Sequence, residues 1–166
     1  MYGVYVIIVM LALLWITTRR MRRKAPSMFS RYDEKARRAI FFARARALQM
    51  GSSVIGPEHL LLGLIHEENT PARSFLLPDW NSWFEAEVRQ RIETHEPLST
   101  KTEIPLNHAS KRILAYAAEE AKLLSHKHIG TEHLLLGLLR ERPSVTTELL
   151  EQKNICLEKV RGAFKS

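Results

Sequence analysis

The chain has 166 residues, 45% of them hydrophobic, which is enough for one domain with a buried core. Its single cysteine, Cys156, excludes an internal disulfide framework and a cysteine-based zinc site. The net charge is +7, but five of these charges belong to one basic cluster of Arg19, Arg20, Arg22, Arg23 and Lys24. The remaining residues carry 7 − 5 = +2, so we expect no nucleic-acid partner.

Residues 2–18 form an uncharged apolar run, which predicts a single transmembrane helix over residues 1–18. At 1.5 Å per residue this run spans about 25 Å, near the lower limit for crossing a bilayer. The sequence RRMRRK follows at once, and this abrupt flank favours a membrane span over a buried core helix. A cleaved signal peptide would carry its positive charges before the apolar run.

The position of the basic cluster also predicts how the chain is oriented. Positive residues stay on the cytoplasmic side of a membrane, so we expect the N-terminus outside and the rest of the chain inside. Residues 19–30 are then a membrane flank and a short tether, because the six residues 25–30 reach at most about 20 Å. The predicted location is the inner (cytoplasmic) membrane, with the folded part close to its surface.

Tyr32 to Met50 is predicted to form the first long helix, with Asp33 as its N-cap. The spacing predicts a core face of Ile40, Ala43, Ala47 and Met50, with Phe41 and Leu48 beside them. The rest of this helix is basic. That pattern fits a solvated face, and it also fits a patch that meets anionic lipid headgroups.

One segment occurs twice: residues 55–65 read IGPEHLLLGLI and residues 129–139 read IGTEHLLLGLL. Nine of the eleven positions are identical, so the folded part is predicted to consist of two copies of one unit. The run LLLGL is apolar almost all round, which indicates a central, buried helix in each copy.

Each copy of this segment has a glutamate in its first turn and a glycine in the middle of its helix. Glu58 and Glu132 lie in the first turn, where a carboxylate compensates the positive end of the helix dipole. Gly63 and Gly137 lie in mid-helix, which costs about 1 kcal/mol relative to alanine. We therefore expect another helix to approach closely at both glycines. The alternative is a small residue that is merely tolerated.

The rest of the first unit is predicted to contain two more helices, over residues 70–77 and 81–93. The apolar side of the second favours core packing over an exposed binding surface, and it consists of Trp80, Trp83, Phe84, Val88 and Ile92. Residues 94–105 are polar with two prolines, and they read as a linker.

The second unit repeats this order. Asn107 is predicted to cap a helix that runs to Leu124, and further helices follow the repeated segment over residues 144–151 and 155–164. No stretch alternates with period two, so no sheet is expected. The predicted fold class is all-α: two pseudo-symmetric four-helix repeats, at about 31–93 and 106–165, form one compact bundle.

The sequence offers no convincing catalytic or metal-binding constellation. His126, His128 and His133 gather around one predicted loop, but the chain has no H-E-x-x-H motif. His59 and His133 belong to the repeated segment, which favours a structural role. No glycine-rich dinucleotide loop and no serine nucleophile elbow occur. We expect no enzyme activity, no cofactor and no metal.

The repeated segment and MFSRYDEKARRAI at residues 28–40 closely resemble the Clp repeat domain, the N-terminal domain of ClpA- and ClpC-type unfoldases. The resemblance covers residues 28 to about 164. It implies a compact helical pseudo-dimer that recruits adaptors and protein substrates to a ring-shaped ATPase. In ClpC-type members it also implies phosphoarginine binding at two sites, with the guanidinium contacted by glutamates that fall on Glu58 and Glu132.

The chain departs from this family at two points. A family threonine that helps to hold the phosphate is replaced by Asp33 in the first unit and Asn107 in the second. Asp33 would repel a phosphate unless Arg31 and its neighbours compensate, whereas Asn107 can still donate a hydrogen bond. In addition, no G-x-x-x-x-G-K-[ST] loop occurs, so the chain cannot hydrolyse ATP by the family's mechanism.

These features predict a non-catalytic docking module at the membrane. Its expected partner is a Clp ATPase, an adaptor, a protease core or a client protein. The expected contact residues are Glu58, Glu132, Arg31 and Asn107. The alternative is a membrane-attached scaffold whose basic first helix lies on lipid and which has no role in proteolysis.

Overall fold

A computed structural model of the chain describes residues 29–165, and Arg31–Ser166 form one compact unit. The predicted transmembrane helix over residues 1–18 and the basic flank from Arg19 to Lys24 lie outside the described residues. Within residues 29–165, no helix is both long enough and apolar enough to cross a bilayer.

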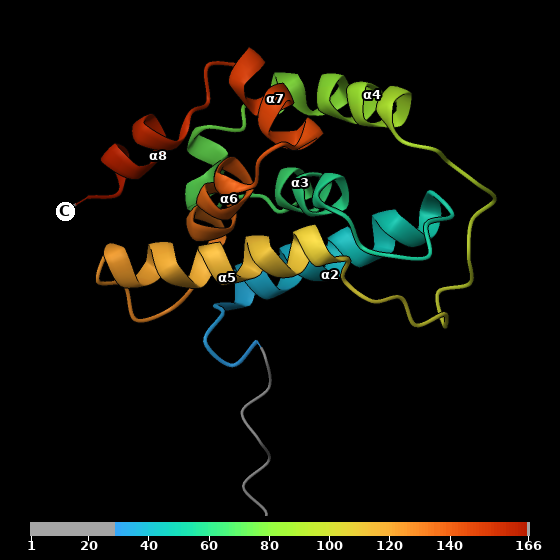
Figure 1. The fold of residues 1–166 in the computed structure, drawn as a ribbon, viewed down its shortest axis with the longest axis horizontal. Coiled ribbons are helices and arrows are strands. Elements are labelled where there is room, and N and C mark those ends of the chain that lie inside the picture. Colours follow the sequence, from blue (N-terminus) through green and yellow to red (C-terminus); the bar gives the residue numbers. More distant parts are fainter. Residues whose placement is uncertain (1–28, 166) are drawn as a thin grey trace, which may run out of the picture. The chain divides into compact units, whose positions relative to one another are not determined.

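The described residues are helical, and their only β-type pairings are two isolated bridges. The α-helices are α2 (Glu34–Gln49), α3 (Pro57–His66), α4 (Asn81–Arg91), α5 (His108–Leu123), α6 (Thr131–Arg140), α7 (Val145–Gln152) and α8 (Leu157–Ala163). The helices lie in three layers, with α3 and α6 between the α2–α5 pair and a layer of α4, α7 and α8 (Figure 1). The all-α prediction is confirmed for this part of the chain.

The first repeat departs from the predicted four helices. Residues 70–77, predicted as a short helix, contain only a 3₁₀ turn over Pro71–Ser74, and a second 3₁₀ turn follows over Pro78–Trp80. The two prolines bracket a segment of six residues, and each lacks the N–H that a continuing helix would need. Among the described residues, the first repeat therefore has three α-helices and the second has four.

Both predicted N-caps are confirmed. The Asp33 carboxylate accepts a hydrogen bond from the Ala36 N–H at 2.7 Å, and the Asn107 side chain accepts one from the Ser110 N–H at 2.8 Å. Each bond satisfies a backbone donor that has no partner inside its own helix. The two long outer helices α2 and α5 thus begin in the same way.

The central helices pack against the outer ones at their glycines. A Cβ atom placed on Gly63 would lie 2.2 Å from the Ala39 carbonyl oxygen of α2, and one on Gly137 would lie 2.5 Å from the Ile113 carbonyl oxygen of α5. No side chain fits at such distances. The close approach predicted from the sequence is therefore confirmed in both repeats.

The two repeats exchange contacts at their first residues. Tyr32, just before α2, forms a β-bridge with Ile129, just before α6, while Ile55, just before α3, bridges to Leu106, just before α5. The Tyr32 hydroxyl also donates a hydrogen bond to the Leu114 carbonyl oxygen at 3.2 Å. The start of each outer helix is consequently held by the other repeat.

The predicted core is largely buried, with one clear error. Phe41 was predicted to lie beside the core face of α2, but it is 62% exposed. It follows Ile40 by about 100° around the helix, which turns it away from α3, and its ring packs edge-on against that of Phe42. On α4, Phe84 and Val88 are fully buried, as expected for core residues, whereas the predicted core residues Trp80, Trp83 and Ile92 are half-buried.

Candidate functional site

Glu58 and Glu132 occupy equivalent positions at the starts of α3 and α6. Their side chains are 21% and 12% exposed. Each carboxylate folds back over the glycine that precedes its helix. A Cβ on Gly56 would lie 2.0 Å from Glu58 Oε1, and one on Gly130 would lie 2.4 Å from Glu132 Oε2. The carboxylates therefore sit at the positive ends of the helix dipoles, as the sequence predicts.

Burial makes both carboxylates costly to ionise. Desolvation raises the pKa of Glu58 and of Glu132, while a contact with the residue's own backbone lowers it in part. Glu132 Oε2 is buried and has no hydrogen-bond partner within residues 29–165. A buried carboxylate oxygen without a donor is under-satisfied, so this atom would gain from a cation or a donor supplied by a partner.

The histidines that follow these glutamates have a structural role. The Nδ1 atom of His59 accepts the Gly56 N–H at 3.0 Å, and that of His133 accepts the Gly130 N–H at 2.9 Å. Burial is the main cause that lowers the pKa of each histidine to about 4, so both rings are neutral at pH 7. They cap the starts of α3 and α6, and the structural role that their place in the repeated segment predicts is confirmed.

The two sites are assembled across the repeats, which corrects the pairing inferred from chain order. The Asp33 N–H donates to the Ile129 carbonyl at 3.0 Å, so Asp33 belongs with Glu132 and not with Glu58. The Asn107 N–H donates to the Ile55 carbonyl at 3.1 Å, which places Asn107 with Glu58. The negative charge of Asp33 contributes to the raised pKa of Glu132. Asp33, which the sequence analysis expects to repel a phosphate, therefore lies at the site of the second glutamate.

Arg31 also lies at the Glu132 site. Its carbonyl oxygen accepts the Ile129 N–H at 2.9 Å, and the residue is exposed. The predicted contact residues thus form two groups. Arg31 and Glu132 belong to one group, and Asn107 and Glu58 to the other.

Several basic residues of α2 are engaged within the domain. Arg38 Nη2 lies 2.6 Å from Oε1 of the buried Glu67, and Arg46 Nη1 lies 3.4 Å from Glu85 Oε1. Arg44 Nη2 donates to the Thr102 carbonyl oxygen at 2.7 Å. Three basic residues that the sequence analysis considered as lipid contacts therefore form contacts within the domain instead.

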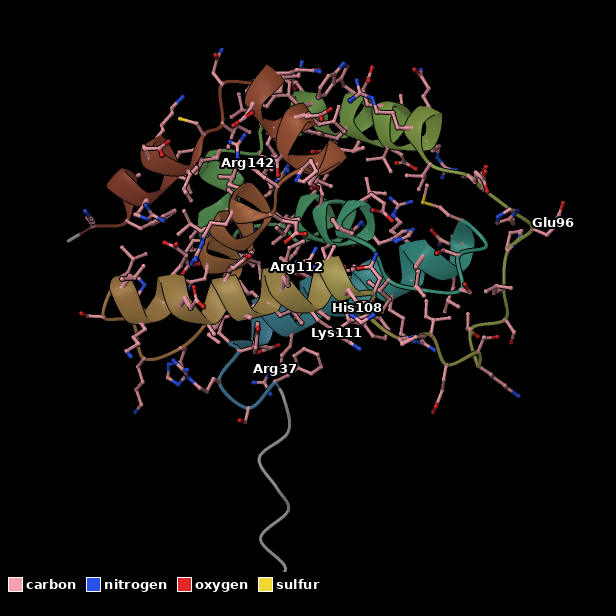
Figure 2. All side chains as sticks on the ribbon, viewed as in Figure 1. Arg37, Glu96, His108, Lys111, Arg112 and Arg142 are labelled. Atoms are coloured by element: carbon pink, nitrogen blue, oxygen red, sulfur yellow. The ribbon has the colours of Figure 1, made fainter. Side chains whose placement is uncertain are left out.

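Equivalent cations remain exposed on the two outer helices. Figure 2 shows Arg37 on α2 and Lys111 on α5 projecting from the α2–α5 layer. Arg112, next to Lys111, forms an ion pair with the buried Glu141, which repeats the pairing of Arg38 in the first unit. The exposed basic face is thus smaller than the sequence of α2 suggests.

One group of side chains has the composition of a metal site. Ligand atoms of His126, Glu132 and His133 all lie within 4.8 Å of one another, whereas the sequence analysis grouped His126 with His128 and His133. Because His133 Nδ1 accepts the Gly130 N–H, the ring hydrogen of neutral His133 resides on Nε2. That nitrogen faces His126 and has no lone pair for a metal, so the arrangement fits a hydrogen-bonded group better.

Comparison with known proteins extends the resemblance seen in the sequence. The Clp repeat (R) N-terminal domain family matches residues 31–153. The ClpA homolog of Guillardia theta, described as an ATP-dependent Clp protease ATP-binding subunit, is 39% identical over 135 residues, which are 81% of this chain and 16% of that protein. The chloroplastic chaperone protein ClpC of Pisum sativum is 38% identical over 140 residues, which are 82% of this chain and 15% of that protein.

Solved structures show the same fold. The N-terminal domain of the chaperone ClpD from Arabidopsis thaliana has a TM-score of 0.65 at 24% identity and covers 82% of this chain and 93% of that one. The N-domain of ClpV from Vibrio cholerae has a TM-score of 0.69 at 14% identity and covers 84% and 86%. The chain spans 15–16% of the length of the two curated relatives. With the family matched over residues 31–153, the chain belongs to the Clp repeat (R) N-terminal domain family.

Proposed function

We propose that the chain is a non-catalytic protein-binding module, held at the membrane, that docks substrates, adaptors or components of a Clp ATPase and protease machine. The observation that carries the proposal is the pair of carboxylates, Glu58 and Glu132, at the starts of two equivalent buried helices. Both are largely desolvated but keep an exposed edge. Such groups gain more from a partner's cation than a fully solvated carboxylate does.

The chemistry of the two sites favours a guanidinium or ammonium group on a protein partner. A guanidinium presents parallel N–H donors, which match the two oxygens of a carboxylate. At Glu132 such a group would also supply the donor that Oε2 lacks. Asp33 adds negative charge there, whereas Asn107 leaves the Glu58 site less acidic. The two sites should therefore prefer different partner groups.

The proposed link to a Clp machine rests on the relatives. One of them is described as an ATP-binding subunit of a Clp protease, and this chain matches 16% of its length. These 166 residues contain no phosphate-binding loop, so the proposal places the ATP-driven step outside them. The membrane attachment rests on the apolar run at residues 2–18 and on the five basic residues from Arg19 to Lys24.

The test is partner capture from a lysate of the source cells by the immobilised full chain in detergent. The test variant carries Glu58→Gln and Glu132→Gln, which keep the side-chain size but remove both charges. The control variant carries Glu96→Gln and Glu103→Gln, which remove the same charge from an exposed connection (Figure 2 labels Glu96). Charge-assisted hydrogen bonds contribute about 1.5–3 kcal/mol, so capture should fall about tenfold or more in the test variant.

Three outcomes are distinguishable. A Clp ATPase, adaptor or protease subunit that is lost only from the test variant supports the proposal. A broad set of clients lost in the same way supports a role in collecting substrates. Equal capture by the test and control variants, or no specific capture, contradicts a docking role for these carboxylates.

A further inference from the structure

His126 forms a hydrogen bond whose direction is fixed by its surroundings. It is half-buried in the loop between α5 and α6, and its Nδ1 lies 2.9 Å from His133 Nε2. His133 Nδ1 already accepts the Gly130 N–H, so its Nε2 carries the ring hydrogen and donates. His126 Nδ1 must then be the acceptor, which requires that this nitrogen carry no proton.

The first repeat lacks this bond, although its backbone is equivalent. The Ser52 N–H donates to the Ala47 carbonyl oxygen at 2.9 Å, and the His126 N–H donates to the Ala121 carbonyl oxygen at 2.8 Å. Ser52 therefore occupies in the first repeat the place of His126 in the second. In agreement with this, His59 Nε2 is buried and has no hydrogen-bond partner among residues 29–165.

The groups around His126 are mostly acidic. From the start of α6 it faces His133 and Glu132, and Asp33 at the start of α2 lies close enough to raise the pKa of Glu132. The negative charge of Glu120 on α5 favours the charged form of His133, which raises its pKa in part. The Glu120 carboxylate itself forms ion pairs with Arg140 and Arg161. In its own loop, His126 is followed by Lys127 and His128, both exposed.

A proton added to His126 Nδ1 would place two N–H donors against each other at the present distance. The bond from His133 must then break. Glu132 belongs to the same close group of three side chains, and its Oε2 is an acceptor without a hydrogen-bond partner in the described chain. A positively charged imidazolium beside this carboxylate is favoured by charge as well as by hydrogen bonding.

We propose that His126 is a proton-sensitive positioning residue of the Glu132 site: when it takes up a proton from solvent, it releases His133 and donates to Glu132. Its consequence for binding rests on the proposed function, because the imidazolium would occupy the carboxylate that a partner's cation would use. The Glu58 site has serine at this place, so its carboxylate is independent of such a switch. Protonation of this histidine thus changes one site of the pair and leaves the other unchanged.

The test uses nuclear magnetic resonance of the full chain in detergent micelles, with labelled histidine ring nitrogens and glutamate carboxyl carbons, between pH 8 and pH 5. This is the range in which histidine usually changes charge. At pH 8, Nδ1 of His126 should give the resonance of an unprotonated acceptor. On acidification this resonance and the Glu132 carboxyl carbon should shift together with one midpoint, while Glu58 stays unchanged through that midpoint.

Reciprocal variants provide the matched control. His126→Ser should abolish the Glu132 shift in this range. Ser52→His should give His59 Nε2 an acceptor and create a corresponding shift at Glu58. The proposal is overturned if His126 titrates in the wild-type chain without moving Glu132, or if His126→Ser leaves the Glu132 shift intact. No partner is needed for this measurement, so its result does not depend on the outcome of the capture experiment.

Discussion

Replacing the buried mid-helix glycines by alanine should destabilise the domain, although alanine favours a helix. The Cβ atom of Gly63→Ala would lie 2.2 Å from the Ala39 carbonyl oxygen, whereas ordinary contacts of a Cβ atom begin at 3.4 Å. The helices α2 and α3 must therefore separate by roughly 1 Å, and overpacking of this kind costs about 1–3 kcal/mol. The higher helix propensity of alanine offsets about 1 kcal/mol of this cost, which leaves a net loss of up to about 2 kcal/mol.

Two further glycines complete the comparison. Gly137→Ala should cost somewhat less than Gly63→Ala, because its Cβ lies 2.5 Å from the nearest backbone oxygen. Gly162→Ala should gain up to about 1 kcal/mol, because its Cβ would meet nothing within 4 Å and its residue lies in α8. Urea denaturation followed by far-ultraviolet circular dichroism measures all three. The packing argument is refuted if Gly63→Ala unfolds at the same urea concentration as the wild type or above it.

Other substitutions test the caps and the buried charges. The folded-state pKa of His59, about 4, lies below its usual 6.5. Its contribution to the free energy of unfolding is therefore complete above pH 6.5 and is lost as the pH falls towards 4. This loss is about 3 kcal/mol. His59→Gln keeps an acceptor for the cap and should be less acid-sensitive by that amount in denaturation at pH 7 and pH 4. Glu120→Gln, at a fully buried carboxylate, should cost about 2 kcal/mol in urea denaturation, against at most about 0.5 for the exposed Glu119→Gln. Asp33→Ala and Asn107→Ala should each cost about 1 kcal/mol by the same measurement, and an unchanged midpoint would deny them a capping role.

Sequence reasoning works well where the repeat and local chemistry determine the structure. The caps Asp33 and Asn107 are set by hydrogen bonds within one helical turn, and the same chemistry is visible in the sequence. Gly63 and Gly137 occur at the same place in both copies, and a repeated cost of this kind indicates a repeated packing need. The class of fold and the buried central helices follow from these signals.

What the sequence does not determine is how the repeats are combined. A linear reading assigns Asp33 to the site of Glu58, whereas the β-bridge from Tyr32 to Ile129 carries it to Glu132. Such an exchange depends on contacts between residues almost a hundred positions apart. The bond between His126 and His133 is equally hidden, because it requires the loop after α5 to fold back on α6.

The predicted membrane span remains a prediction for residues 1–18. If it is correct, a detergent-free membrane fraction should retain the full chain after washing with high salt and carbonate. A chain that begins at Arg31 should be released by the same treatment. Release of the full chain by salt alone would indicate that the basic cluster, and not the apolar run, holds it at the membrane.

The most direct test of the central claim is the ratio of partner captured by the Glu58→Gln/Glu132→Gln chain to that captured by the Glu96→Gln/Glu103→Gln chain. Both variants lose two negative charges, so the ratio reports the two helix-start carboxylates and not the net charge. We predict a ratio of about one tenth or less for a Clp component or its clients. A ratio close to one would show that partners, if they bind, do not use these carboxylates.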